Sequence, residues 1–236
     1  LVTGFVLLGT SFETMQISAL LEEAAAMQGL GDVPAGVFLA TFLIGLSALL
    51  KSAQFPAHGW LPEVMETPTP VSALLHAGII NAGGYLIIRF ADVMLLSAGS
   101  LHMIAIIGGF TALFGSVVML TQPSIKVALA WSTIAQMGFM MLQCGLGAFS
   151  AAMLHIVAHG LYKAHAFLSS GSVVEYLRAR IGLAEPKPAP AAMIAVAFAL
   201  ALGVYAGIGV LFGSTLFTEP AIVTLGAILI LGLTHL

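Results

Sequence analysis

The sequence predicts an all-α membrane protein, a polytopic bundle of transmembrane helices. Only 7% of the 236 residues are charged and 60% are hydrophobic, whereas about 25% of residues in a soluble domain are charged. Continuously apolar runs also recur along the chain, and about 20 such residues cross the ~30 Å hydrocarbon core as a helix. A β-barrel would instead show shorter segments that alternate apolar and polar residues.

About seven full membrane spans are predicted, preceded by the tail of an earlier one in residues 1–10. The chain begins without Met, and its last apolar run reaches Leu236 without a polar exit. We therefore expect a fragment, the central part of a longer subunit, in which residues 1–236 belong to a single transmembrane domain. The full spans are predicted at residues 34–51, 71–91, 101–121, 125–145, 150–172, 190–212 and 219–236.

Basic residues are distributed unevenly between the loops on the two sides of the membrane. Alternating the loops places Lys126, Arg178, Arg180 and Lys187 on one side and Arg89 on the other. Cytoplasmic loops carry the excess of lysine and arginine, so the first side is predicted to be cytoplasmic. We expect a multi-pass protein of the cell inner (plasma) membrane. It is predicted to contact the lipid bilayer and to bind no nucleic acid.

The first full span ends at Lys51, which is followed by Gln54, Pro56, His58 and Pro62. Because proline removes a backbone hydrogen bond, we predict a broken helix between Lys51 and Pro62. Interrupted membrane helices build ion sites at mid-depth. A second interpretation is that Lys51 ends the helix and extends its ammonium group to the interface, and its position alone does not separate the two.

Three titratable residues in the span at 150–172 share one helix face. His155, His159 and Lys163 stand at i, i+4 and i+8, a spacing that stacks side chains about 6 Å apart along the helix. This distance suits proton relay through water, and histidine exchanges protons near neutrality. His76 lies in the middle of another span. Since ionisable groups inside a membrane are costly, they are functional candidates.

We therefore predict a proton pathway along a buried line of lysines and histidines. Zinc binding by the pair His155 and His159 is disfavoured, because no HExxH sequence or nearby acidic or cysteine residue completes a site. The sequence contains no nucleotide fingerprint, iron–sulfur cysteine set or haem motif, so no cofactor is predicted. The pathway residues are Lys51, His76, His155, His159 and Lys163, with Lys126, His58 and His235 as further candidates.

Several long motifs resemble one protein family. Residues 51–62 (KSAQFPAHGWLP) and 66–76 (ETPTPVSALLH) resemble the signature of the antiporter-like membrane subunits of respiratory complex I and of Mrp-type cation/proton antiporters. Residues 126–138 and 155–164 resemble the next two family blocks. The resemblance covers residues 1–175 and implies a larger antiporter-like fold, with Lys51 on a broken helix and a polar axis along the membrane plane.

The segment from His76 to Asp92 is most similar to the DabB-type subunit of energy-coupled inorganic-carbon uptake complexes. That resemblance implies other membrane or peripheral subunits as partners, among them a zinc-containing, carbonic-anhydrase-like protein. The chain departs from its antiporter relatives between Ala191 and Gly213, where it lacks their further Lys or Glu. This leaves His235 as the only later candidate and puts a conventional exit path in doubt.

Three functions follow from these observations. The first is a proton-translocating subunit that energises uptake of CO2 or bicarbonate, without a catalytic site of its own. The second is a proton-pumping subunit of respiratory NADH:quinone oxidoreductase or of an Mrp Na+/H+ antiporter. The third, from a different class, is a non-conducting membrane scaffold for a catalytic partner. The aligned stripe of His155, His159 and Lys163 favours transport over the scaffold.

Overall fold

The computed structural model of the chain describes residues 1–29, 33–171, 192–196, 198–200 and 202–203. Its residues group into two compact units, Leu1–Tyr176 and Leu177–Leu236. In the second unit the described residues are short helical stretches. Most of the predicted span 190–212, all of 219–236 and His235 lie outside the described residues. The assignment of residues 1–236 to a single domain stays a prediction.

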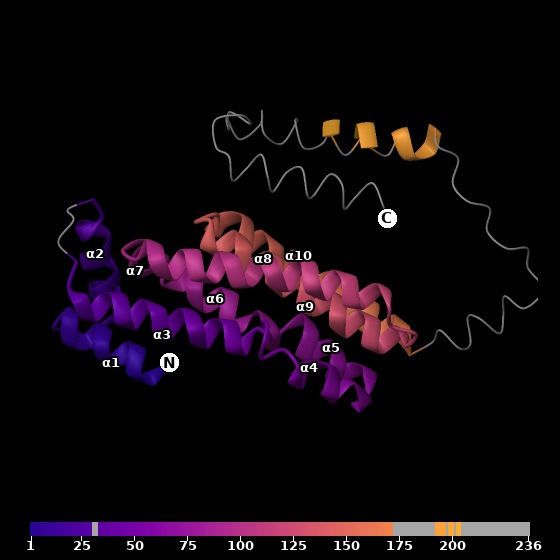
Figure 1. Ribbon diagram of the computed structural model, residues 1–236, viewed down its shortest axis with the longest axis horizontal. Coiled ribbons are helices and arrows are strands. Elements are labelled where there is room, and N and C mark those ends of the chain that lie inside the picture. The colour runs from indigo at the N-terminus through magenta and orange to yellow at the C-terminus, as the bar shows by residue number, and fades with distance from the viewer. Residues whose placement is uncertain (30–32, 172–191, 197, 201, 204–236) are drawn as a thin grey trace, which may run out of the picture. The chain divides into compact units, whose positions relative to one another are not determined.

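The first unit begins with three helices, drawn in indigo and violet in Figure 1: α1 (Val2–Ser11), α2 (Ile17–Met27) and α3 (Ala35–Lys51). Helices α1 and α3 pack together, and Gly4 permits their close approach because a Cβ atom there would lie 3.2 Å from the Ala40 carbonyl oxygen. The amphipathic helix α2 was not predicted. It packs on α7 (Ala91–Leu95).

The break predicted between Lys51 and Pro62 is confirmed. Helix α3 ends at Lys51, and the chain becomes helical again only in α4 (Trp60–Glu63) and the 3-10 turn η1 (Val64–Glu66). The backbone amide of Phe55, released by the break, donates to Thr111 Oγ1 at 3.1 Å. The broken segment is therefore held against α8 (Ala98–Leu120).

A second break, which the sequence did not predict, interrupts the span expected at 71–91. This span consists of α5 (Thr69–Ala77), the 3-10 turn η2 (Ile79–Asn81) and α6 (Ala82–Arg89). Side chains take up two backbone carbonyl groups at the break: Asn81 Nδ2 donates to Ala77 O at 2.6 Å, and Ser52 Oγ donates to Ile80 O at 2.9 Å. Side chains inserted into the helical ladder are a known cause of such interruptions.

In the described part of the chain, three helices are long and apolar enough to cross a membrane: Thr69–Arg89, Ala98–Leu120 and Ile125–Gly145. Helix α10 (Phe149–Ser170) has comparable length, but its histidines and lysine lower its mean hydropathy. These helices match the spans predicted at 71–91, 101–121, 125–145 and 150–172. Helix α3, with 17 residues, is shorter than these four segments.

Among the described helices, α8 and α9 (Ile125–Gly145) share the most extensive contact. Glycines line their contact: a Cβ atom at Gly108 would lie 2.7 Å from the Leu142 backbone nitrogen, and one at Gly145 would lie 2.4 Å from that of Ala105. Small residues let membrane helices approach through their backbones, which maximises van der Waals contact. This pairing fixes the position of α9, which carries the polar residues described below.

We expect Gly108→Ala to destabilise the protein by about 1–3 kcal/mol, because the added methyl group overpacks a backbone contact. Gly109→Ala is the matched control on the same helix, since its Cβ would meet only Leu142 Cδ1 at an ordinary 3.7 Å. Thermal unfolding of both variants of the full-length protein in detergent provides the measurement. Equal midpoints for the two would contradict the close α8–α9 contact.

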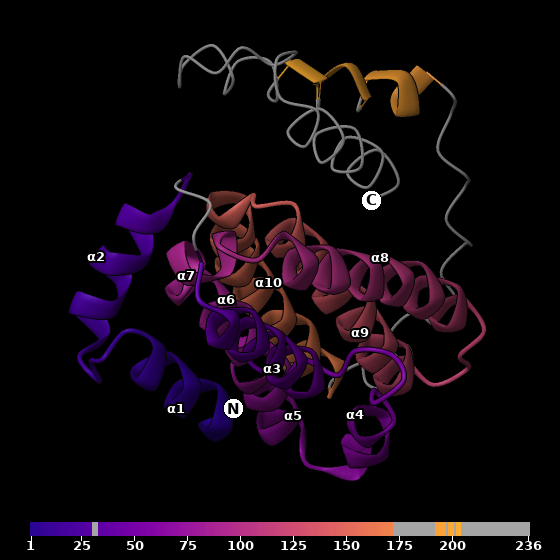
Figure 2. The same cartoon turned by 60° about the vertical axis from the view of Figure 1, so that its left-hand side comes forward.

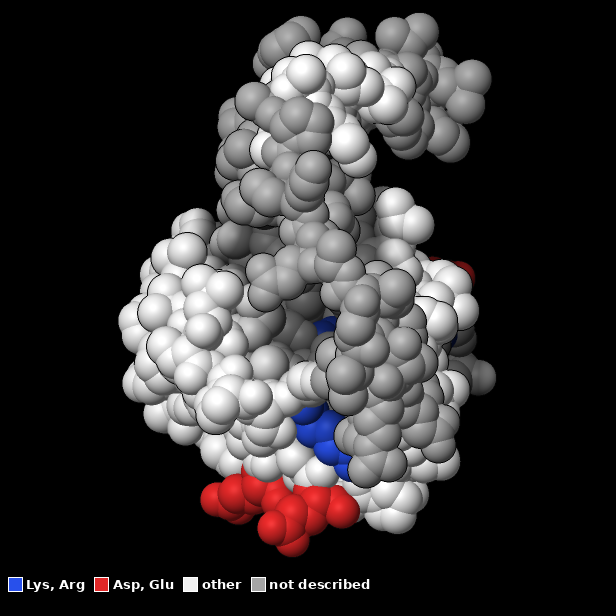
Figure 3. All heavy atoms as spheres, turned by 90° about the vertical axis from the view of Figure 1, so that its right-hand side faces the viewer, with Lys and Arg blue, Asp and Glu red and all other residues white. Residues whose placement is uncertain are grey.

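Helix α10 packs against α5 and α9, and also touches α6. Figures 1 and 2 show these segments, which are distant in sequence, side by side in the bundle. The described surface is mostly uncharged in the view of Figure 3, where a group of acidic side chains lies at the lower edge with basic side chains beside it. The arrangement of α5, α9 and α10 brings three of the predicted residues, His76, His159 and Lys163, into one interior region.

Candidate proton pathway

Lys163 of α10 is fully buried. Its Nζ donates to Leu129 O at 3.1 Å and to Ser132 Oγ, both on α9. The ammonium group also lies within electrostatic reach of His76 and His159, and no carboxylate pairs with it among the described residues. A buried cation without a counter-ion is costly in a membrane protein, which marks Lys163 as a functional candidate.

The Leu129 carbonyl oxygen is shared by more donors than it has lone pairs. Besides Lys163 Nζ, it lies within hydrogen-bond distance of Ser132 Oγ at 2.8 Å and of Thr133 Oγ1 at 3.0 Å. A carbonyl oxygen has two lone pairs, and a hydroxyl hydrogen rotates to suit its partners. At least one of these hydroxyl groups is therefore free to turn elsewhere at any moment.

His76 of α5 is fully buried beside the same group. Its Nδ1 lies 3.1 Å from Thr133 Oγ1, and its ring stacks on Phe167 with 4.4 Å between centroids. Its Nε2 is buried without a hydrogen-bond partner. Through Thr133 and Leu129 a short chain of polar contacts thus connects His76 with Lys163.

His159 lies one helical turn before Lys163 and is 5% exposed. Both of its ring nitrogens are buried without a partner. Its ring is 5.9 Å from that of His155, whose Nδ1 contacts Gln143 Oε1 at 2.9 Å. Buried polar atoms of this kind normally form hydrogen bonds with protein or ordered water. Water is therefore the partner that would supply the missing hydrogen bonds of these nitrogens.

The other predicted residues are not part of this group. Lys51 is exposed and makes no hydrogen bond or ion pair within the described part of the chain. Lys126 is half-buried and donates to Thr67 O at 3.0 Å, which ties α9 to the turn before α5. His58 is half-buried, with Phe55, Phe114 and Trp131 around its ring.

Two contacts of the site were not predicted from the sequence: the Gln143 amide beside His155 and the Phe167 ring on His76. The structure places Ser132 and Thr133 at Lys163 and His76, whereas Gln136 is exposed. Polar residues recurring at helical spacing along α9 were the signal that could have revealed Gln143.

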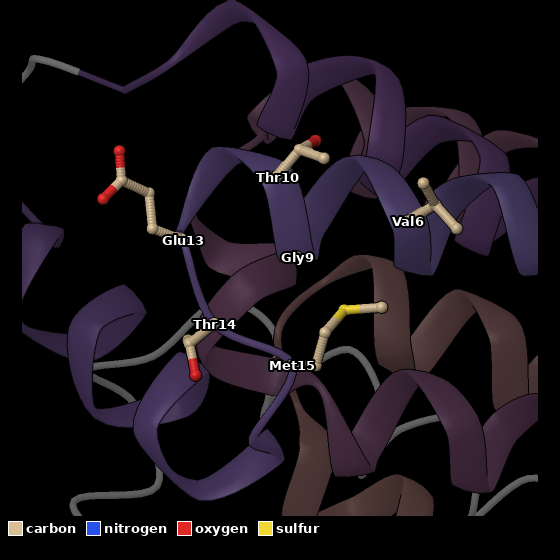
Figure 4. Close-up of a pocket in the computed structure, with 6 residues that line it drawn as sticks. All are labelled: Val6, Gly9, Thr10, Glu13, Thr14 and Met15. Carbon is tan, nitrogen blue, oxygen red and sulfur yellow. The ribbon is translucent and has the colours of Figure 1, made fainter.

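The pocket drawn in Figure 4 is lined by other residues. This shallow pocket at the end of α1 (Figure 4) is lined by Val6, Gly9, Thr10, Glu13, Thr14 and Met15. Its volume is about 420 Å³. The pocket contains neither histidine nor lysine. No group of three or more His, Cys, Asp or Glu side chains suited to a metal ion occurs among the described residues.

A family model described as "NADH:quinone oxidoreductase/Mrp antiporter, TM" matches residues 1–231. The chain belongs to this family. Its apolar helices and its membership of this family make it a membrane protein. The antiporter-like fold predicted from the motifs is therefore confirmed. It is also supported by the structure of the Mrp complex from Dietzia sp., which matches with a TM-score of 0.68 at 32% identity over 86% of this chain and 22% of that one.

Curated relatives belong to two kinds of complex. The protein named "Probable inorganic carbon transporter subunit DabB1" from Halothiobacillus neapolitanus is 51% identical over 78% of this chain and 33% of its own length. "Probable inorganic carbon transporter subunit DabB" from Hydrogenovibrio crunogenus is 57% identical over 58% of this chain and 26% of its length. "NAD(P)H-quinone oxidoreductase subunit 5, chloroplastic" from Cryptomeria japonica is 38% identical over 82% of this chain and 26% of its own length. The chain thus spans a third or less of these relatives.

Proposed function

We propose that this chain conducts protons as part of a membrane subunit in a multisubunit complex, and that the complex takes up inorganic carbon. The observation that carries the first part is the cluster of fully buried Lys163 and His76 with nearly buried His159, around which three histidine nitrogens lack partners. Packing alone gives no reason to bury a cation and two histidines between apolar helices, so the scaffold function has no support from this region.

In this proposal Lys163 and the histidines exchange protons through water and through the hydroxyl groups of α9. The excess of donors at Leu129 O leaves a hydroxyl group free to reorient between Lys163 and His76. His155 and His159 continue the line along α10, with rings 5.9 Å apart. Because both ring nitrogens of His159 lack a partner among the described residues, one or two waters complete each step in this proposal.

The choice of inorganic carbon over quinone chemistry rests on similarity. The relatives named as inorganic carbon transporter subunits are 48–57% identical to this chain, against 37–41% for the NAD(P)H-quinone oxidoreductase subunits. We therefore propose that the subunit sits in the cell inner membrane, beside other subunits that include a zinc-containing, carbonic-anhydrase-like partner. A proton-pumping role in a quinone oxidoreductase or an Mrp antiporter is the second candidate.

The partner and the substrate are tested together. The full-length subunit is tagged and purified from its native membrane, and its partners are identified by mass spectrometry. Uptake of labelled bicarbonate and CO2 is measured in cells with and without the subunit. A zinc-containing partner and uptake that a protonophore abolishes support the proposal. Co-purified quinone-reductase subunits with unchanged carbon uptake would replace it with the second candidate.

Two substitutions test whether Lys51, at the start of the broken segment, takes part in proton conduction. We expect Lys51→Arg to insert normally and to lose about tenfold in proton flux, because a guanidinium group stays protonated at accessible pH and cannot release a proton. Lys51→Ala is expected to fail similarly while insertion is unimpaired, since the penalty for a charge in the membrane is removed. Proton flux per inserted protein is measured in proteoliposomes. Full flux in both variants would make Lys51 a helix-end residue at the interface.

A further inference from the structure

The two helix breaks meet in space, although they are far apart in the sequence. Ser52 is fully buried at the end of α3, and its hydroxyl group donates to Ile80 O in the second break at 2.9 Å. The backbones of α3 and α6 also approach each other closely here, since a Cβ atom at Gly83 would lie 2.3 Å from Ala48 O. The segment after Lys51 and the segment after His76 therefore form one junction.

Two buried amide side chains flank this junction. Gln54 is 1% exposed and donates its Nε2 to Ser52 O at 2.8 Å, and Asn81 is 5% exposed and donates its Nδ2 to Ala77 O at 2.6 Å. Because a carbonyl oxygen only accepts hydrogen bonds, the NH2 group of each amide must face it. The orientation of both side chains is thereby determined, with the amide oxygens turned away from these carbonyls.

In the part of the chain that the structure describes, neither amide oxygen receives a hydrogen bond. Gln54 Oε1 and Asn81 Oδ1 are buried and have no hydrogen-bond partner among the described residues. Leaving a buried acceptor unsatisfied costs about 1–3 kcal/mol. Structural waters occupy such positions in proteins, where each makes about three hydrogen bonds to groups that would otherwise be unsatisfied.

We infer that Gln54 Oε1 and Asn81 Oδ1 bind ordered water at the junction of the two helix breaks, and that this water connects the segment after Lys51 with His76. The second half of the inference rests on the proposed proton conduction. Gln54 follows Lys51 by three residues, and Asn81 follows His76 by five. The Nε2 of His76 is likewise buried without a hydrogen-bond partner among the described residues. Neither amide titrates, so each holds the water and exchanges no proton itself.

The water site is tested first by structure. A cryo-electron microscopy map of the full-length subunit in its complex, at a resolution that reveals water, is expected to contain a density peak within hydrogen-bond distance of each amide oxygen. A protein donor at these oxygens, including the Lys51 ammonium group, or empty space there would overturn the inference. This result does not depend on whether the subunit conducts protons, so it is separate from the test of the proposed function.

The connection is tested by Gln54→Met and Asn81→Leu, which replace each amide with an apolar side chain of similar size. Gln122→Met is the control, because Gln122 already donates to Val118 O within its own segment. We expect both test variants to lose the water density and at least about tenfold of the flux per folded protein, with the control unchanged. Flux that falls only as folded protein falls would contradict the connection. Absence of flux in the wild type would instead defeat the proposed function and leave the map to decide the water site.

Discussion

Lys163→Met is expected to lose at least about a hundredfold of the proton flux, equivalent to about 2.7 kcal/mol in the barrier, while the protein inserts and folds normally. Lys163 is fully buried, and its ammonium group is held by Leu129 O and Ser132 Oγ. Methionine fills a similar volume but neither carries nor releases a proton. A proton at His159 or His76 would then meet no acceptor at the place where α5, α9 and α10 converge.

The stability of the Lys163→Met variant separates transport from structure. Replacing a buried charge with a well-packed apolar residue is often neutral or stabilising, so a thermal midpoint equal to or above that of the wild type is expected. Arg89→Met is the matched control, because Arg89 is exposed and lies outside the cluster. The measurement is flux in proteoliposomes together with thermal unfolding. A destabilised Lys163→Met variant with normal flux per folded protein would show that Lys163 serves packing alone.

The second large effect is expected at His159. His159→Ala should lower proton flux by at least about thirtyfold, because both ring nitrogens are buried without a partner among the described residues and the ring lies between His155 and Lys163 along α10. His155→Ala should lower flux less, since this ring is only half-buried and Gln143 remains beside it. Both are measured as flux per inserted protein, with thermal unfolding as the control for folding. Losses of flux that merely follow losses of folded protein would contradict a role in conduction.

Much of the fold was predictable because hydropathy and proline are local signals. The spans at 101–121, 125–145 and 150–172 correspond to α8, α9 and α10, and the break after Lys51 lies where the prolines predicted it. The second break was not predictable in this way. Residues 71–91 form one apolar run, and the bond from Ser52 to Ile80 O that stabilises the interruption comes from a distant segment.

The candidate site was also predicted only in part. The i, i+4, i+8 spacing correctly placed His155, His159 and Lys163 on one helix, and the structure brings His76 beside them. Their partners depend on tertiary packing: nothing local links His76 with Thr133, which is 57 residues away, or Lys163 with Leu129. The exposure of Lys51 was likewise beyond sequence reasoning, because its position fitted both a buried ion site and a helix end.

The central claim, that His155 and His159 pass protons in series with Lys163, is tested most directly by the double variant His155→Ala/His159→Ala. Proton flux of the full-length subunit in its complex is measured in proteoliposomes for both single variants and the double, normalised to inserted protein. A chain that is cut once is already cut, so the double variant is expected to be little worse than the worse single variant. Full flux in the double variant, or losses that multiply as for independent sites, would contradict the relay.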